Sequence, residues 1–184
     1  MKGGGNKKCL AYVAIFIVFQ IIVITIFALT VMKIKGPKVR FQTATVSNFN
    51  SDSSTAASFS GDLVTKFAVK NTNFGHFKYP NSTVSILYEG QMIGTAAVPS
   101  QKAKARSTRR TDITISIDSS KLSGTTNLTS AIGAGVVPLT SESTLKGKVE
   151  VMKIIKKNKS GKMSCTMSLN LKTKTVDDLK CKLN

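Results

Sequence analysis

The sequence predicts an all-β domain, built as an antiparallel β-sandwich and preceded by one N-terminal transmembrane helix. Residues 10–32 form an almost unbroken apolar run, and short segments with period-two alternation recur after residue 38. No long helical period is visible beyond the apolar run. The 184 residues therefore divide into a leader at 1–9, a helix at 10–32, a stem at 33–38 and one domain at 39–184.

The apolar run has the length of a membrane span. Its residues, at a rise of about 1.5 Å each, cover roughly 34 Å, which exceeds a hydrocarbon core of about 30 Å. A cleavable signal peptide is the alternative, because Lys2, Lys7 and Lys8 precede the run. Signal-peptide apolar regions are about 7–15 residues long and end at small residues, whereas this run is longer and leads into Lys33. We therefore expect a retained anchor.

The orientation of this anchor is harder to predict, because lysines and arginines flank both of its ends. The positive-inside rule therefore gives almost no prediction, and it slightly disfavours an external C-terminus. Three N-x-[ST] sequons, at Asn81, Asn127 and Asn158, are usable only outside the cytoplasm, although such triplets also arise by chance. They favour a cytoplasmic leader and an external domain. Cys9 then lies at the cytoplasmic boundary, where S-palmitoylation is common, or it stays unmodified.

The strands of the domain are predicted from alternation and from turn residues. A Ser/Thr/Asn-rich stretch at 48–61 is expected to be a long exposed loop, and 119–131 a loop with one short helix. A polar tip at 156–161 is expected to connect two of the strands as a hairpin. The predicted strands are one opening at 39–41, then 63–70, 84–88, 92–98 after a turn at Glu89-Gly90, 111–118, 145–155, 163–171 and 179–183.

The charge balance favours anionic partners. The chain has a formal net charge of +18, and because all nine acidic and 20 of the 27 basic residues follow residue 41, the distal part alone carries +11. Lipid head groups, acidic polysaccharide and nucleic acid suit such a balance, and solvated loops are the alternative explanation. No aromatic residues are interleaved with the basic residues, which disfavours single-stranded nucleic acid. Two basic clusters are candidates for anionic-surface contact: Lys102, Lys104, Arg106, Arg109 and Arg110, and Lys153, Lys156, Lys157, Lys159 and Lys162.

The sequence gives little support for catalysis. Its single histidine, His76, lies in a turn-like segment, and no cysteine, histidine or carboxylate spacing matches a metal site. The Gly133-Ala134-Gly135 segment lacks the third glycine of a dinucleotide fingerprint. We therefore predict a non-enzymatic protein without a catalytic residue, a metal or a cofactor.

Cys165 and Cys181 are predicted to be cross-strand neighbours. If strand 163–171 turns back into 179–183 around 172–174, opposed positions sum to about 346, which is the sum of these two numbers. A disulfide is expected if the domain is external, and a pair of buried thiols if it is not.

The order of these features resembles the plant late embryogenesis abundant type 2 proteins, also called the hydroxyproline-rich glycoprotein group and related to harpin-induced-like proteins. The family's Asn-Pro-Asn turn appears here as Asn71-Thr72-Asn73, with Thr in place of Pro, and the chain has only four prolines. The other residues that carry the likeness, after the leader and helix, are Val39-Arg40-Phe41, Phe67-Ala68-Val69-Lys70, Tyr79, Tyr88-Glu89-Gly90 and Leu145-Lys146-Gly147-Lys148-Val149-Glu150-Val151.

The resemblance implies a fibronectin- or immunoglobulin-like β-sandwich, a plasma-membrane address, and roles in abiotic stress and defence without an established catalytic activity. We expect an interaction protein whose partners are the membrane, anionic lipid or acidic cell-wall polysaccharide, and other membrane proteins. A lipid-contacting or lipid-transferring domain is the second hypothesis, and an apolar groove long enough for an acyl chain would favour it.

Overall fold

The computed structural model describes residues 5–31, 33–52, 58–122, 126–151 and 154–183. The chain forms two compact units, Met1–Ile34 and Lys35–Asn184. The first unit contains one helix, and the second contains the strands.

The helix of the first unit, α1 (Gly5–Val31), meets the requirements of a membrane span in length and hydropathy. Its segment Lys8–Thr30 has a mean hydropathy of 2.8. Its two threonines satisfy their hydroxyl groups within the helix, since Thr25 Oγ1 donates to the Ile21 carbonyl at 2.7 Å and Thr30 Oγ1 to the Ile26 carbonyl at 2.8 Å. Such internal bonds remove the cost of placing hydroxyl groups in hydrocarbon. The helix is therefore a candidate membrane anchor.

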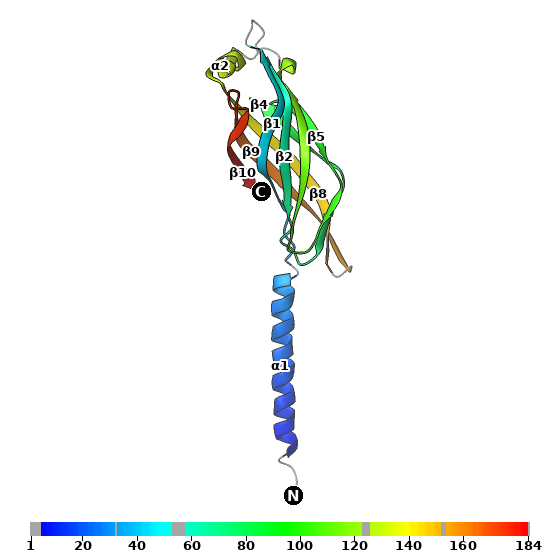
Figure 1. Cartoon of the computed structure of the whole chain (residues 1–184). Coiled ribbons are helices and arrows are strands. Elements are labelled where there is room, and N and C mark those ends of the chain that lie inside the picture. Colours follow the sequence, from blue (N-terminus) through cyan, green and yellow to red (C-terminus); the bar gives the residue numbers. More distant parts are fainter. Residues whose placement is uncertain (1–4, 32, 53–57, 123–125, 152–153, 184) are drawn as a thin grey trace. The chain divides into compact units, whose positions relative to one another are not determined.

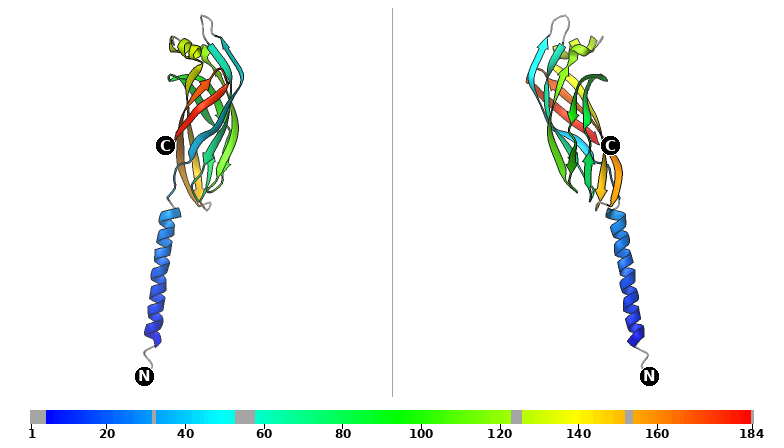
Figure 2. Two further views of the ribbon diagram at one scale, coloured as in Figure 1. Left: turned by 60° about the vertical axis from the view of Figure 1, so that its left-hand side comes forward. Right: turned by 90° about the vertical axis from the view of Figure 1, so that its right-hand side faces the viewer.

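The second unit is a closed β-barrel (Figure 1 and Figure 2), and two further strands extend its sheet. Within the described residues, eight strands form the ring in the order β4-β5-β7-β2-β1-β10-β9-β8, and the pairing of β4 with β8 closes it. Strands β3 and β6 extend from the last part of β8. The bounds are β1 (Lys38–Asp52), β2 (Ser58–Lys70), β3 (His76–Tyr79), β4 (Ser82–Tyr88), β5 (Gln91–Val98), β6 (Gln101–Ala103), β7 (Thr108–Asp118), β8 (Val136–Val151), β9 (Ile155–Asn170) and β10 (Thr175–Leu183).

The prediction of a fibronectin- or immunoglobulin-like sandwich is therefore wrong in architecture, although the all-β class is right. The reason lies in the length and bending of the strands. β8 and β9 each have 16 residues, so β8 is long enough to pair with β9 on one edge and with both β3 and β4 on the other. β1 contains two register shifts, and such bulges increase the twist that lets a sheet curl and close.

In the described part of the chain, two of the strand pairings that form the ring consist of one residue pair each. β1 meets β10 at the pair Thr45–Thr175, and β5 meets β7 at the pair Gly94–Ile117. Gly94 permits the second pairing, because a Cβ there would lie 2.5 Å from the Ser116 carbonyl oxygen and 2.9 Å from Ile117 Cγ2. A side chain at this position would push β5 away from β7.

The barrel interior is filled with side chains that alternate along the strands. β2 buries Leu63, Thr65 and Phe67 while Val64 and Lys66 face outward, and β7 repeats this pattern around Ile115. This close packing leaves a core of aromatic and branched residues. The fully buried side chains include Phe59, Phe67, Phe77, Tyr88, Ile86, Ile93, Ile117, Leu145 and Leu169.

Several loop predictions are corrected by these strand bounds. The loop predicted at 48–61 is mostly strand, because β1 continues to Asp52 and β2 begins at Ser58. The polar tip predicted at 156–161 lies inside β9, and the β8–β9 register centres the turn between Val151 and Ile155. Both errors arise because polar residues on a solvent-facing strand resemble loop residues. At 119–131 a 3₁₀ turn (Ser119–Lys121) and α2 (Thr126–Ala134) are present, in agreement with the predicted short helix.

Candidate functional site

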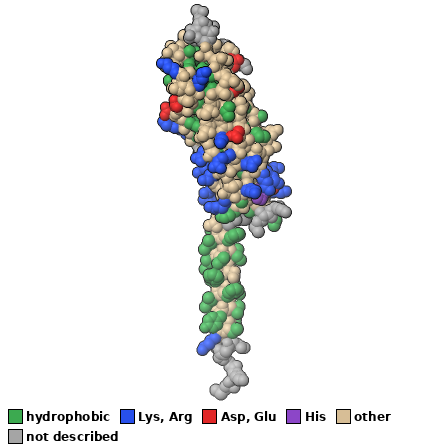
Figure 3. Space-filling model, in the orientation of Figure 1, with side chains coloured by type: hydrophobic (Ala, Val, Ile, Leu, Met, Phe, Trp, Pro, Cys, Tyr) green, Lys and Arg blue, Asp and Glu red, His purple; other side chains and the backbone are tan. Residues whose placement is uncertain are grey.

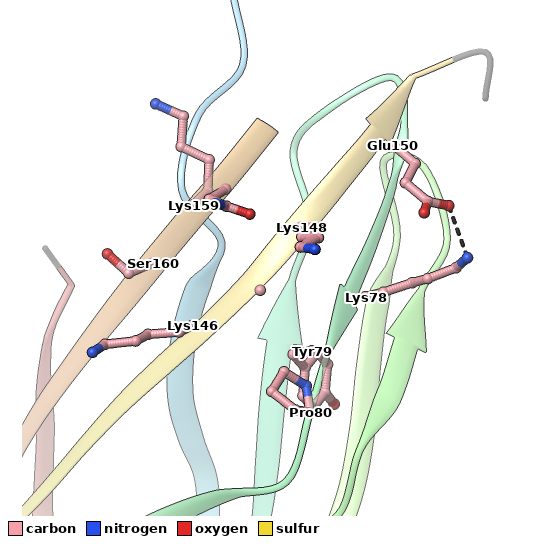
Figure 4. Close-up of a pocket in the computed structure, with 10 residues that line it drawn as sticks. Lys78, Tyr79, Pro80, Lys146, Lys148, Glu150, Lys159 and Ser160 are labelled. Atoms are coloured by element: carbon pink, nitrogen blue, oxygen red, sulfur yellow. Dashed lines mark ion pairs between the residues drawn. The ribbon is translucent and has the colours of Figure 1, made fainter. Parts of the chain in front are cut away.

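The candidate site is a groove of about 760 Å³ on the outer side of the barrel, where β3, β8 and β9 run side by side (Figure 4). Lysine side chains from all three strands surround it, and their aliphatic stems together with Pro80 supply apolar walls. The lining residues are Lys78, Tyr79, Pro80, Lys146, Gly147, Lys148, Glu150, Asn158, Lys159 and Ser160.

The alternation of β8 explains why charged residues line this groove. Leu145, Val149 and Val151 point into the core, so Lys146, Lys148 and Glu150 point outward. Gly147, in the middle of this stretch, allows β3 to lie close to β8, because a Cβ on it would collide with the Lys78 carbonyl oxygen and lie 2.6 Å from the Phe77 ring. The groove is thus a consequence of β3 packing on the last part of β8.

One ion pair crosses the groove. Lys78 Nζ lies 2.8 Å from Glu150 Oε2, and Glu150 is the one carboxylate among the described lining residues. The hydrogen bond from Lys78 lowers the pKa of Glu150; burial acts in the opposite direction, and the charges of Lys78, Lys156 and Lys102 lower it further. Glu150 is therefore ionised at neutral pH. Within the described ranges, Lys146, Lys148 and Lys159 have no carboxylate at ion-pairing distance, so the groove keeps an excess of positive charge.

A second hollow of about 540 Å³ adjoins the groove and shares Lys78 and Glu150 with it. Among the described residues, the ring nitrogen Nδ1 of His76 has no hydrogen-bond partner, and neither has the hydroxyl of Tyr79, which lines the groove. Burial raises the pKa of Tyr79, and the positive charge of Arg109 partly opposes this effect. The remaining lining residues are Phe74, Gly75, His76, Lys102 and Lys156.

The Asn71-Thr72-Asn73 turn fixes the stem to this region. The Asn71 side chain is fully buried, and its Nδ2 donates to the carbonyl oxygens of Gly75 at 2.8 Å and Lys104 at 3.0 Å. Its Oδ1 accepts from both the backbone N–H and the side-chain amide of Asn73 at 3.1 Å. Asn73 in turn accepts from the Lys35 N–H at 2.7 Å and donates to the Lys35 carbonyl at 2.8 Å.

The first predicted basic cluster is divided by the structure. Lys102 lines the second hollow, and Arg106 lies with its guanidinium 4.7 Å from the centre of the Phe74 ring. Lys104 is exposed in the adjoining β6–β7 turn. Arg109 and Arg110 instead lie on β7, where their Nε atoms donate to the side chains of Gln101 at 2.6 Å and Gln42 at 2.7 Å.

The second predicted cluster lies on β9. Lys156 and Lys159 line the two hollows, Lys157 and Lys162 are exposed, and Lys153 lies outside the described residues. The structure therefore brings Lys102 and Lys156, one from each cluster, to the same hollow. Sequence reasoning missed Lys78, Lys146 and Lys148, which are dispersed along strands. The alternation of β8 was the available signal for the last two.

The predicted glycosylation and lipidation sites are exposed, and the two predicted disulfide cysteines lie opposite each other. Asn81, Asn127 and Asn158 are all exposed, and Asn158 also lines the groove. Cys9 is exposed on α1. Cys165 and Cys181 are directly opposed in the β9–β10 register, and a disulfide joins them. Among the described residues, no group of three His, Cys, Asp or Glu side chains is arranged to hold a metal ion.

Comparison with known proteins gives a family. The family model described as late embryogenesis abundant protein matches residues 66–167, which include the Asn71-Thr72-Asn73 turn and all the described lining residues of the groove. The late embryogenesis abundant protein At1g64065 of Arabidopsis thaliana is 28% identical over 177 residues, which cover 95% of this chain and 82% of that protein.

Two solved structures show a weaker likeness. The solution structure of AT1g01470 from Arabidopsis thaliana has a TM-score of 0.45 and 19% identity, and covers 75% of this chain and 83% of its own. A crystal structure of a protein from Archaeoglobus fulgidus has a TM-score of 0.36 and 10% identity, and covers 78% of this chain and 95% of its own. On the strength of the family model and the sequence relative, the chain belongs to the late embryogenesis abundant type 2 family.

Proposed function

We propose that this member of a stress-associated family is a single-pass, membrane-anchored interaction protein of the plasma membrane, active in stress and defence responses. Its N-terminus is cytoplasmic, its barrel is external, and it acts without catalysis. The barrel presents the groove between β3, β8 and β9 to an anionic surface or polymer. The observation that carries this proposal is the excess of lysine over carboxylate in the groove.

The charge distribution supports an anionic ligand. Lys146, Lys148 and Lys159 come from two neighbouring strands, and the one ion pair found among the described groove residues involves Lys78 instead. Lysines that line one groove repel one another, so a bound anion relieves this repulsion. Acidic wall polysaccharide and lipid headgroups both supply such anions.

An external barrel is supported by its cysteines and its sequons. A disulfide persists in oxidising compartments, and Cys165 is fully buried with its partner directly opposite. The three sequon asparagines are exposed, as a glycosylation enzyme requires. The basic residues that follow α1 act against this orientation under the positive-inside rule, so a direct test of topology is needed.

The packed interior supports an interaction role over lipid transfer. Phe59, Phe67 and Phe77 are fully buried inside the barrel, and the groove that we describe is on its outside. Lipid contact without transfer is the second candidate function. It is favoured by the exposed apolar residues Phe74 and Ile154, which lie close to basic residues.

The binding test uses the full chain in a neutral detergent and a labelled polygalacturonate, with neutral dextran for comparison. A Lys146→Gln/Lys148→Gln double variant is expected to weaken polygalacturonate binding at least several-fold at low salt, with a smaller difference at high salt because screening weakens the contacts. The matched control is Lys172→Gln/Lys180→Gln, which removes the same charge from exposed positions outside the groove. Equal loss in both double variants would show that only net charge matters and would contradict a groove.

The topology test uses the mobility of the expressed chain after glycosidase treatment. A shift that disappears when Asn81, Asn127 and Asn158 are replaced together by Gln supports an external barrel. The absence of any shift, combined with resistance of the barrel to protease added outside intact cells, would contradict it.

A further inference from the structure

We infer that the barrel docks with one end onto the lipid headgroups of the bilayer that α1 crosses, with Phe74 and Ile154 inserted between the lipids. We call this the stem end; it consists of residues 35–37, the turn at 71–75, the β6–β7 turn at 104–107, and the adjoining ends of β8 and β9. The inference rests on the membrane anchoring proposed above and names the partner of the basic surface.

Three turns meet at the stem end. The backbone N–H of Arg106 donates to the Asn73 carbonyl at 3.0 Å, which joins the β6–β7 turn to the turn at 71–75. Gly75 packs so closely on the end of β8 that a Cβ there would collide with Glu150 and lie 2.7 Å from Val151 Cγ2. Ile154 is held to the same place, because its N–H donates to the Val151 carbonyl at 3.2 Å.

Two of these turns expose a large apolar side chain. Phe74 is 49% exposed and Ile154 is 84% exposed, the highest exposure among the large apolar residues that the structure describes. Turn positions usually carry Gly, Asn, Asp, Ser or Pro, so Phe and Ile are not required by the backbone there. Scattered apolar residues are common on protein surfaces. Phe74 and Ile154 indicate a contact surface because basic residues lie close to them on the same turns and strands.

The cations around Phe74 and Ile154 come from three elements. Lys102 and Lys156 lie on either side of the second hollow, Lys104 and Arg106 lie in the β6–β7 turn, and Lys157 follows on β9. Figure 3 shows Lys and Arg side chains gathered on the lower part of the barrel surface in that view. Exposed apolar side chains near basic residues match the two layers of a membrane interface, which are hydrocarbon and phosphate.

The covalent chain limits how far this surface can be from a membrane. Lys35 is bound through both its N–H and its carbonyl to the side chain of Asn73, the neighbour of Phe74. Between Lys35 and Val31, the last residue of α1, are three residues, and four residue steps span at most about 14 Å. A bilayer crossed by α1 is therefore within reach of Phe74, which is why we assign the bilayer and not a soluble polymer to this end.

The test places a fluorophore in the full chain reconstituted in nanodiscs. A Cys9→Ser background leaves the β9–β10 disulfide intact, and an environment-sensitive label is attached at Ile154→Cys or, separately, at Val136→Cys. Val136 is a matched site, because it is an exposed apolar residue at the opposite end of β8. Quenchers attached to the lipid acyl chains report insertion.

In nanodiscs that contain phosphatidylserine, the label at 154 is expected to be quenched at least three-fold more than the label at 136. A Lys102→Glu/Lys156→Glu variant is expected to reduce quenching at 154 to the level at 136, whereas Lys172→Glu/Lys180→Glu leaves it unchanged. A label at Phe74→Cys provides a second readout if the variant at 154 does not fold. Equal quenching of the labels at 154 and 136 overturns the inference, and so does quenching at 154 that is unchanged in the Lys102→Glu/Lys156→Glu variant.

The outcomes also separate this inference from the proposed function. If the label at 154 is not quenched but the nanodisc-bound chain still binds polygalacturonate through Lys146 and Lys148, the docking inference is wrong and the interaction function stands. If the full chain does not enter nanodiscs at all, both are wrong, because α1 is then not an anchor.

Discussion

Replacing Asn71 by Ala is expected to destabilise the barrel strongly. The Asn71 side chain is fully buried and its amide group bonds to three backbone carbonyls, with distances of 2.8 Å to Gly75, 3.0 Å to Lys104 and 3.3 Å to Ala103. An amide has two N–H groups, so we count two full donated bonds, and a third bond is accepted from the Asn73 N–H at 3.1 Å. All of these are lost in the variant.

The size of the effect follows from the burial of these groups. A buried group left without its partner costs about 1–3 kcal/mol, and part of this cost is recovered at Lys104 because that residue is exposed to water. We therefore expect a loss of about 3–4 kcal/mol in the free energy of unfolding. For a domain of this size each kcal/mol lowers the melting temperature by about 2–4 °C, which gives a decrease of about 10 °C.

The assay is thermal unfolding of the full chain in detergent, followed by circular dichroism with the disulfide kept oxidised. Asn71→Asp keeps the shape of the side chain but cannot donate to the three carbonyls, so it is expected to lose at least as much stability as Asn71→Ala. Asn158→Ala, on the exposed surface of β9, is the control and is expected to change the melting temperature by less than about 2 °C. If Asn71→Ala unfolds within about 2 °C of the unchanged protein, the assignment of these hydrogen bonds as stabilising is refuted.

Further predictions concern Glu150, two glycines, the disulfide and the apolar helix. Glu150→Gln is expected to tighten polyanion binding at pH 7, because it releases Lys78. The pKa of Glu150 is lowered from its ordinary value of 4.5 in the folded state, so the ionised carboxylate stabilises the fold above pH 4.5 and this stabilisation is lost as the pH falls through the lowered pKa. The urea midpoints of Glu150→Gln and of the unchanged protein should therefore become equal below that pKa. Gly94→Ala should lower stability by about 1–3 kcal/mol through the β5–β7 pairing, whereas Gly133→Ala, with open space around its Cβ in α2, should raise it by about 0.5–1 kcal/mol in the same urea titration. Serine at both positions of the β9–β10 disulfide should cost about 3 kcal/mol, and peptide mass spectrometry without reduction reports whether the bond forms in cells. Deleting residues 10–32 should release a folded barrel that stays in the supernatant at high salt.

Local features of the fold were predictable because their signals are short-range. The turn at Glu89-Gly90 connects β4 and β5 as expected, and both residues have positive φ, 47° and 82°, as a two-residue hairpin turn requires. The closure of the barrel was not predictable in this way. It depends on β4 pairing with β8 and on bulges in β1, which are contacts between distant segments that leave no period in the sequence.

The pairing of Cys165 and Cys181 was predicted correctly, although the register assumed for the two strands was only partly right. Thr175 pairs with Asn170 and Val176 with Leu169, so the pairs next to the turn sum to 345 and not 346. A register shift between Asp177 and Lys180 adds one residue and brings the two cysteines opposite each other. The prediction was right at the cysteines because this bulge offset the difference in the turn.

The candidate site was only partly predictable, because runs of lysine in the sequence do not correspond to one surface. Arg109 and Arg110 belong to the first cluster in sequence, but their guanidinium groups donate to Gln101 on β6 and Gln42 on β1. Lys148 was missed because it is flanked by apolar residues, although alternation brings it next to Lys146 on the same face of β8. Charge on a strand is therefore better predicted from every second residue than from runs.

The Asn-x-Asn turn binds Lys35 beside the basic surface, and its chemistry explains why proline at the central position is dispensable. In the described part of the chain, the hydrogen bonds of this turn come from the two asparagine side chains and from the backbone of Asn71 and Asn73. Thr72 donates none of them, so a proline there would lose no donor and a threonine gains none. The two asparagines are required together, because Asn73 holds Lys35 and Asn71 holds Asn73. A chain that keeps both asparagines therefore keeps the stem bound next to Phe74, whatever residue separates them.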